Sequence, residues 1–167
     1  MQRFFYFHYM KRNLLISFLL LAIMIFVMRW QGSELITPQS SKGILDLELA
    51  KTAERFHQLQ LFWNHETVLQ NIYLDFLFII SYTWFLVTAC KTVNNTKSNL
   101  FSGLAISAGA FDVLENFLMI LVWNGRFEPS LLQVVYYAAA IKFLLAGIVA
   151  GYLLLSLFGL FKRANKI

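Results

Sequence analysis

Four long apolar stretches, separated by polar segments, dominate the hydrophobic pattern of the chain. They cover residues 13–30, 70–91, 99–124 and 130–161. A helix rises about 1.5 Å per residue, so each stretch can cross a hydrocarbon core of about 30 Å, the first together with its flanks. The pattern predicts an all-α integral membrane protein in which residues 1–167 form a single membrane domain with four transmembrane helices.

The polar segments between the stretches predict how the helices are connected. Those at 91–98 and 124–130 are short, which predicts that consecutive helices are antiparallel neighbours in a bundle. The segment 31–70 is longer, and within it apolar residues recur at helical spacing over 44–63. We therefore expect an amphipathic outer-face helix at 44–63, between the first and second crossings. Its charges are of mixed sign, which favours a cap on the bundle over a helix lying on the membrane surface.

The distribution of charged residues predicts how the four helices are oriented across the membrane. With the N-terminus in the cytoplasm, the inner segments contain no acidic residue and eight basic ones: Arg3, Lys11, Arg12, Lys91, Lys97, Lys162, Arg163 and Lys166. Such an excess is typical of cytoplasmic loops. No small-x-small cleavage site follows the first stretch, so we expect an uncleaved anchor and not a signal peptide. The sequence predicts a multi-pass protein of the cell (inner) membrane with both termini in the cytoplasm.

Composition excludes several other classes of protein. Residues are 59% hydrophobic and 14% charged, against roughly 25% charged in a soluble domain. The net charge of +5 follows from the topology, and no interleaved basic and aromatic surface suggests a nucleic-acid partner. The sequence also lacks a nucleotide-binding glycine loop, a His-Glu-x-x-His zinc motif, a Gly-x-Ser-x-Gly elbow and a Cys-x-x-Cys pair. Membrane lipids are the expected partners.

Carboxylates interrupt two of the apolar stretches. Asp75 lies in the second, Asp112 and Glu115 lie in the third, and Lys142 lies in the fourth. A charge at the centre of a bilayer costs at least about 2.5–3.5 kcal/mol, so such residues are functional candidates. Counted from the basic inner ends, all four lie about 18–28 Å along their helices. The sequence therefore predicts that they share one site in the outer half of the membrane.

Helical spacing also orients these residues. Asp112, Glu115 and Asn116 share one face of the third helix, which Ala105, Ala108 and Gly109 continue. Asn71, Asp75 and Tyr82 align on the second helix. Small residues let helices approach closely, so we expect the face of the third helix to point into the bundle.

Three acids facing one lysine leave an unbalanced negative charge in a poor solvent. Paired carboxylates of this kind can act as general acid and base, as proton carriers, or as oxygen ligands for a divalent cation. The predicted catalytic residues, which are also the candidate metal ligands, are Asp75, Asp112 and Glu115. In that reading Asp112 or Glu115 is the base, and Asp75 is its partner acid or a metal ligand. The predicted substrate-binding residues are Asn71, Tyr82, Asn116 and Lys142.

The expected function is binding or modifying a lipid-like molecule, with a divalent cation as the candidate cofactor. Two other functions stay open. In a proton- or cation-coupled transport component, the acids would lie on a water path that reaches both faces. In a non-enzymatic assembly subunit, joined to another membrane protein or to a second copy, neighbouring helices would satisfy the acids through hydrogen bonds worth about 0.6–2 kcal/mol each. The long stem of Lys142 could also carry its ammonium to the outer interface.

Overall fold

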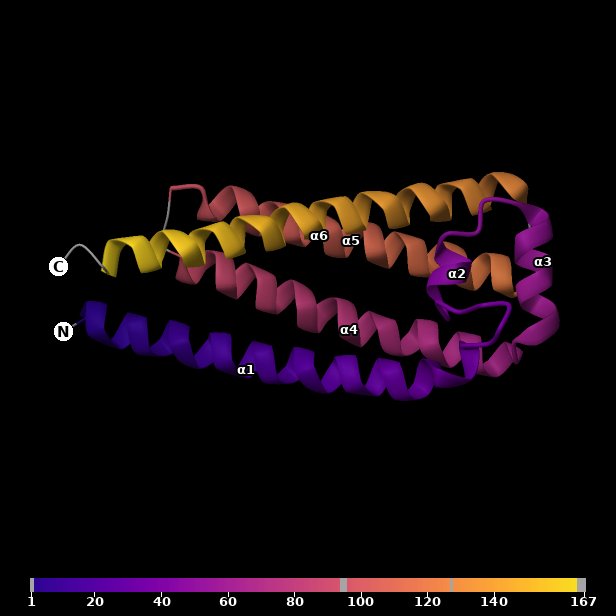
Figure 1. Cartoon of the computed structure of the whole chain (residues 1–167), viewed down its shortest axis with the longest axis horizontal. Coiled ribbons are helices and arrows are strands. Elements are labelled where there is room, and N and C mark those ends of the chain that lie inside the picture. Colours follow the sequence, from indigo (N-terminus) through magenta and orange to yellow (C-terminus); the bar gives the residue numbers. More distant parts are fainter. Residues whose placement is uncertain (1, 94–95, 127, 165–167) are drawn as a thin grey trace.

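The four apolar stretches form long helices in the computed structural model, which describes residues 2–93, 96–126 and 128–164 (Figure 1). They are α1 (Gln2–Gln31), α4 (His65–Thr92), α5 (Ser98–Trp123) and α6 (Pro129–Ala164). All four are long and apolar enough to cross a membrane, and the described part of the chain contains no β-strand. These findings confirm an all-helical chain with four candidate membrane-spanning helices.

Capping residues, more than the apolar pattern, determine where these helices begin and end. Helix α4 begins at His65 instead of residue 70, because the side chain of Asn64 accepts hydrogen bonds from the amides of Glu66 and Thr67. Helix α6 begins at Pro129, whose fixed φ and missing N–H suit a first helical position. After α5, Gly125 adopts a φ of 90°, and its amide bonds to the carbonyl of Val122. This left-handed turn is a common helix ending, in which glycine avoids the strain of a side chain.

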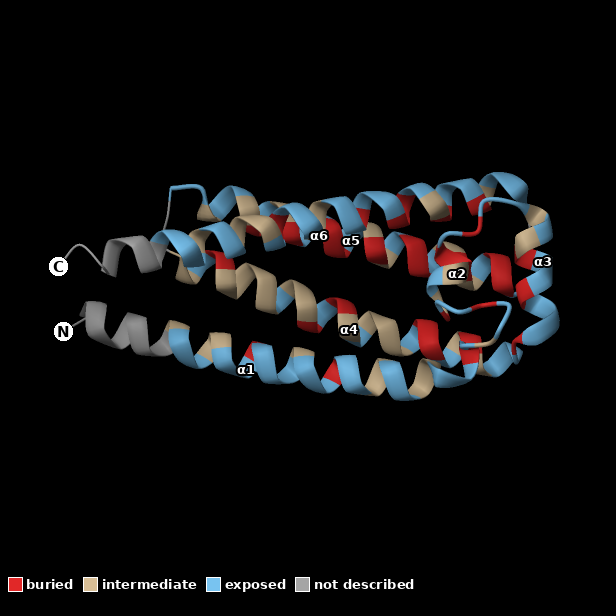
Figure 2. Cartoon of the chain, viewed as in Figure 1, coloured by how far each residue is buried: buried red, intermediate tan, exposed pale blue. Residues whose placement is uncertain are grey.

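The long helices pack in a sequence of neighbours. Helix α1 packs against α4, α4 against α5, and α5 against α6. Figure 1 shows all four lying lengthwise beside one another, and Figure 2 shows that burial is concentrated on α5. In the part of α1 whose side chains are described, only Ser17 and Met24 are buried. Helix α5 is therefore central, and α1 lies at one edge.

Three short helices occupy the segment between α1 and α4. They are η1 (Gly32–Leu35), α2 (Leu45–Glu48) and α3 (Ala53–Phe62), so the single helix predicted over 44–63 is divided in two. Residues 49–52 leave the helical path, and Thr52 begins the new helix. Its backbone is extended, with φ −120° and ψ 149°, and its side-chain oxygen accepts a hydrogen bond from the amide of Arg55. Thr52 thus caps a new helix and cannot continue α2.

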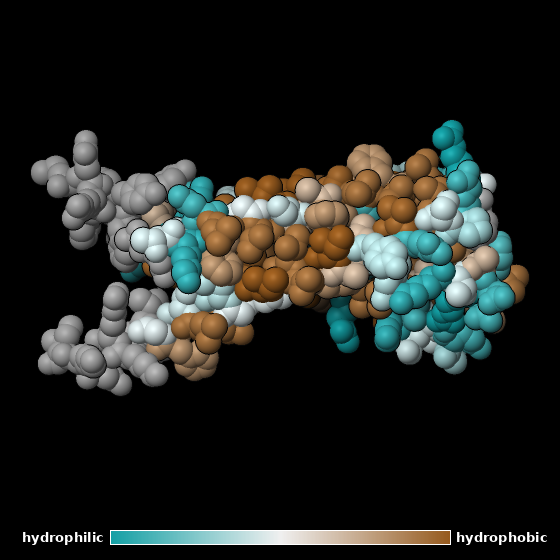
Figure 3. All heavy atoms as spheres, turned by 90° about the horizontal axis from the view of Figure 1, so that it is seen from above, coloured by the Kyte–Doolittle hydropathy of each residue, from teal (hydrophilic) through white to brown (hydrophobic). Residues whose placement is uncertain are grey.

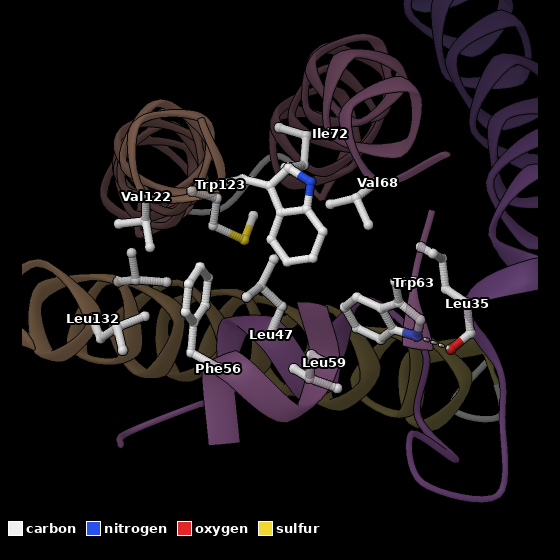
Figure 4. Packing of buried hydrophobic residues seen from close by; sticks show 12 residues of the cluster. Leu35, Leu47, Phe56, Leu59, Trp63, Val68, Ile72, Val122, Trp123 and Leu132 are labelled. Carbon is white, nitrogen blue, oxygen red and sulfur yellow. Dashed lines mark hydrogen bonds between the residues drawn. The ribbon is translucent and has the colours of Figure 1, made fainter. Parts of the chain in front are cut away.

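Helices α2 and α3 cover one end of the long helices, named here the capped end; the start of α1 and the end of α6 lie at the opposite end, named the terminal end (Figure 1). Figure 4 shows apolar side chains from both short helices packed against α4, α5 and α6. The core at this end consists of Leu35, Leu47, Phe56, Leu59, Trp63, Val68, Ile72, Met119, Val122, Trp123, Leu132 and Val135. The indole N–H of Trp63 donates to the carbonyl of Leu35, at 3.0 Å, and holds the loop against this core.

The surface of the protein has an apolar middle and a polar capped end. In Figure 3, hydrophobic side chains cover the middle of the visible face and hydrophilic side chains gather at the capped end. An apolar band bounded by a polar end is what a helical chain presents to a bilayer, because lipid cannot satisfy polar groups.

Candidate functional site

A cluster of charged side chains lies at the centre of the candidate site. The Nζ atom of Lys142 lies 2.7 Å from Asp112 Oδ1, 2.8 Å from Glu115 Oε2 and 3.1 Å from Glu48 Oε2. We name these four residues the Lys142 cluster. All four are buried, and Glu115 is 0% exposed. The contact to Asp112 also has the geometry of a hydrogen bond, whereas the other two are ion pairs defined by distance.

The helix faces explain why these groups meet. Asp112 and Glu115 are three residues apart on α5, so their side chains project from the same face. On α6, Ala138 and Ala139 are buried one turn from Lys142, and their small side chains allow α5 and α6 to approach closely. The lysine stem therefore extends into the protein. The alternative prediction, that Lys142 reaches the outer interface, is wrong, since the residue is only 6% exposed and ends among three carboxylates.

Two further hydrogen bonds join α4 to α5 beside the Lys142 cluster. The hydroxyl of Tyr82 donates to Asp112 Oδ2 at 2.9 Å, and Asn116 Nδ2 donates to Asp75 Oδ2 at 2.7 Å. Both oxygens of Asp112 are thus engaged by neighbouring helices. Glu115 Oε1 and Asn116 Oδ1 are buried without a hydrogen-bond partner among the described residues. The structure therefore brings six of the predicted site residues into one region: Asp75, Tyr82, Asp112, Glu115, Asn116 and Lys142.

Asn71 is the predicted site residue that the structure places elsewhere. Its side-chain amide donates to Gln31 Oε1, and Gln31 Nε2 donates to the carbonyl of Thr67 at 2.9 Å. Asn71 lies one turn from Asp75 on the same face of α4, but at that level the face meets the end of α1. Asn71 therefore links α4 to α1 and does not contact the Lys142 cluster.

Glu48 is the site residue that sequence reasoning missed. It belongs to α2, where the neighbouring acid Asp46 pairs with Arg55 at 3.2 Å. Glu48 and Leu47 are instead both buried, so α2 directs one acid toward Lys142 and one leucine into the core. No spacing in the sequence connects Glu48 with Lys142, because the contact depends on the path of the loop that carries α2.

A pocket of about 340 Å³ lies against the Lys142 cluster. It is lined by Met28 of α1, by Ile44, Leu45 and Glu48 at the capped end, by Asp75, Phe78 and Tyr82 of α4, by Asp112 of α5, and by Lys142, Phe143 and Ala146 of α6. Asp75 and Tyr82 are half-buried, and Phe143 is exposed. The pocket thus has one charged wall, while much of its remaining lining is aromatic or aliphatic.

A second hollow, of about 460 Å³, lies between the same three helices α1, α4 and α6, closer to the terminal end. We name it the apolar groove. Its lining consists of Lys11, Leu14, Leu15, Phe18, Phe85, Ala89, Thr92, Val93, Leu153 and Leu157. Tyr82 of the pocket and Phe85 of the apolar groove are about one turn apart on α4, so the two hollows follow one another along that helix.

The described residues contain no group of three or more His, Cys, Asp or Glu side chains that could hold a metal ion. The predicted ligands Asp112 and Glu115 converge on the ammonium of Lys142, while Asp75 binds the amide of Asn116. The lysine therefore occupies the position among the acids that a divalent cation would need. This geometry gives no support to the candidate cofactor.

No protein-family model, curated protein or solved structure matches the chain. The class of protein is therefore defined by the structure alone. It is an all-helical chain with four candidate membrane-spanning helices and a buried charged cluster beside a pocket.

Proposed function

We propose that this chain is a multi-pass membrane protein whose four long helices form an antiparallel bundle and whose pocket binds the polar end of a lipid-like molecule. The observation that carries this proposal is the succession of the two hollows along α4. The pocket presents charged groups, and the apolar groove presents aliphatic and aromatic side chains. An amphiphile likewise has a polar end that is followed by an apolar chain.

The charge pattern supports one orientation of the bundle. Basic residues without acids characterise the segments at the terminal end, so we place that end in the cytoplasm and the capped end outside. The Lys142 cluster then lies in the outer half of the membrane of the cell. Helices α2 and α3 cover the site on its outer side.

Lateral entry from the lipid is the route that the helix packing favours. Helix α1 lies at one edge and packs mainly against α4, while α6 forms the other side of both hollows. Lipid-facing residues such as Phe143 belong to the pocket lining. A molecule dissolved in the bilayer can therefore reach the pocket between α1 and α6 without crossing the capped end.

If the bound molecule is also modified, Asp75 is the acid placed to exchange a proton with it. Asp75 lines the pocket and is half-buried, and Asn116 is its hydrogen-bond partner among the described residues. Asp112 binds Lys142 and Tyr82, and Glu115 is fully buried against Lys142. General acid or base catalysis needs a group within hydrogen-bond reach of the substrate, which favours Asp75 over the other two acids.

A non-enzymatic assembly role is the second candidate, because Lys142, Tyr82 and Asn116 join buried acids across helices. In that case the ion pairs would only join α2, α5 and α6. A transport role has less support. Between the helices toward the terminal end, the described residues form an apolar cluster around Cys90, Ala105 and Val149, beside the stacked rings of Phe101 and Tyr152.

The binding proposal can be tested by photolabelling. The protein would be reconstituted in phosphatidylcholine nanodiscs with a diazirine-bearing single-chain amphiphile, and the labelled residues would be mapped by mass spectrometry. We expect label on the α1, α4 and α6 residues that line the two hollows. Ala146→Trp fills the pocket and should reduce this label several-fold, whereas the control Ala140→Trp, at an exposed position on a different face of α6, should not.

Uniform labelling of the lipid-facing surface, unchanged by Ala146→Trp, would contradict the binding proposal. It would favour the assembly role instead, because a bundle held by internal ion pairs has no need for a specific amphiphile.

A further inference from the structure

The pocket has more carboxylates than cations. Glu48, Asp75 and Asp112 line it, and Lys142 is the basic residue in its lining. The ammonium of Lys142 is already shared among Glu48, Asp112 and the buried Glu115. Among the described residues, no lysine or arginine forms an ion pair with Asp75. Of the carboxylates that line the pocket, Asp75 is thus the one without an ion pair among the described residues.

This imbalance is costly in the surroundings of the site. A carboxylate removed from water needs a positive partner or several hydrogen bonds to offset its lost hydration. Among the described residues, Asn116 is the hydrogen-bond donor to Asp75, which also lines the pocket and is half-buried. A cation bound in the pocket would supply the missing charge.

Aromatic rings in the same pocket favour a particular kind of cation. Phe78, Tyr82 and Phe143 all line it, and the rings of Phe78 and Tyr82 pack with their centroids 5.5 Å apart. The ring of Phe143 already lies 5.0 Å from the ammonium nitrogen of Lys142. Ring faces attract organic ammonium groups within about 6 Å, an attraction that strengthens when water is excluded. Carboxylates next to aromatic rings thus match an amine better than a hydrated metal ion.

We propose that the polar end of the bound amphiphile is a positively charged amine, which pairs with Asp75 and contacts the rings of Phe78 and Tyr82. The inference rests on the proposed function and specifies its ligand. The hydrocarbon chain of the amine lies in the apolar groove, where Leu14, Phe18 and Leu153 contact it. From Asp75 to Ala89 the groove side of α4 extends about 21 Å, which is most of the thickness of a bilayer core.

The test compares three amphiphiles that share one hydrocarbon chain and differ in headgroup charge: dodecylamine, dodecanol and dodecanoate. Each would compete with a diazirine derivative of dodecylamine for labelling of the wild-type protein in phosphatidylcholine nanodiscs. We expect dodecylamine to reduce the pocket label several-fold more effectively than dodecanol, and dodecanoate to be the weakest competitor.

Variants connect this preference to the residues. Asp75→Asn should remove the advantage of dodecylamine over dodecanol, while the matched control Asp46→Asn, on the surface of the capped end, should keep it. Phe78→Leu preserves apolar volume but removes a ring face, so it should reduce the same advantage. It also keeps the test decisive if Asp75→Asn fails to fold.

The outcomes separate the two proposals. Equal competition by the three amphiphiles, or better competition by dodecanoate, would overturn the amine inference while leaving amphiphile binding intact. Absence of specific pocket label from the single-chain diazirine probe of the binding test would instead overturn the proposed function itself.

Discussion

Lys142 is the residue on which most of the buried charge depends. Its ammonium contacts Asp112 and Glu115 of α5 and Glu48 of α2. A buried ion pair gains little net stability over an apolar pair of the same shape, but removal of one partner leaves the other charge uncompensated. The three acids share one lysine, so the loss of stability should be much larger when the lysine is removed than when one acid is neutralised.

Lys142→Met should therefore be strongly destabilising. We expect the free energy of unfolding to fall by about 3–5 kcal/mol, the range seen when a buried pair loses one member. Denaturant titration in detergent micelles, followed by tryptophan fluorescence, would measure it. The exposed Lys42→Met should change the value by less than about 0.5 kcal/mol. A similar small effect at Lys142 would show that the ion pairs do not contribute to folding.

Neutralising one acid should lower the free energy of unfolding much less than removing the lysine. Asp112→Asn and Glu115→Gln keep the side-chain volume, and Lys142 retains two carboxylates in either variant. We expect both variants to accumulate in the membrane normally, with unfolding free energies within about 1 kcal/mol of wild type. A complementation assay should nevertheless show loss of activity, because the charge at the site has changed. Full activity in both variants would indicate that the acids only join helices.

At the scale of elements, the four-residue helix α2 depends on its contacts with the long helices. It is too short to be stable alone, and it is attached through the burial of Leu47 and the ion pair from Glu48 to Lys142. The ion pair therefore helps to keep α2 over the site.

Glu48→Gln should loosen α2 without unfolding the long helices. We expect faster amide hydrogen exchange in residues 44–52 and unchanged protection in α4, α5 and α6. The control Glu54→Gln changes an exposed acid in the first turn of α3 and should leave the exchange of residues 44–52 unaltered. Unchanged exchange in Glu48→Gln would mean that apolar packing alone holds α2.

The close approach of α4 and α5 depends on Gly109. A Cβ atom there would lie 2.5 Å from Thr83 Oγ1, whereas a Cβ atom at Gly103 would meet nothing within 4 Å. Alanine at either position gains up to about 1 kcal/mol in helix propensity. Overpacking should leave Gly109→Ala about 1–3 kcal/mol less stable than Gly103→Ala. Thermal or denaturant unfolding of both variants would measure the difference, and adding Thr83→Ala should restore most of it. Equal stabilities would indicate that α4 and α5 separate easily at this level.

At the scale of the whole molecule, the edge position of α1 and the covered end determine access to the site. The pocket and the apolar groove both lie between α1 and α6, and α2 lies over the pocket. A bilayer surrounds a membrane-spanning protein on its sides. Hydrophobic molecules would therefore approach the site between α1 and α6, whereas water would approach it from the capped end.

The proposed orientation leads to a topology prediction. Reporter fusions after Lys97 and after Ile167 should show cytoplasmic activity, and a fusion within residues 33–43 should show activity outside, because basic segments stay in the cytoplasm. Fusions at all three positions would be compared in one strain. A C-terminal reporter that is active outside would contradict the four-crossing topology.

The sequence by itself determined the properties that depend on local composition and period. The apolar stretches became the four long helices, and the spacing of Asp112, Glu115 and Asn116 placed all three on a buried face. These features depend on neighbours within a few residues, so hydrophobic periodicity is sufficient to predict them.

Only the tertiary structure decided which of these groups meet. Glu48 joined the Lys142 cluster, Asn71 bonded to Gln31, and Thr52 divided the helix expected over 44–63. The first two outcomes depend on how one helix is rotated against the next and on the path of a loop, neither of which leaves a periodic signal. Thr52 caps α3 through a local hydrogen bond, but the sequence around it does not decide between a cap and a continuing helix. That outcome depends on the core contacts of Leu47 and Phe56, whose partners are distant in the sequence.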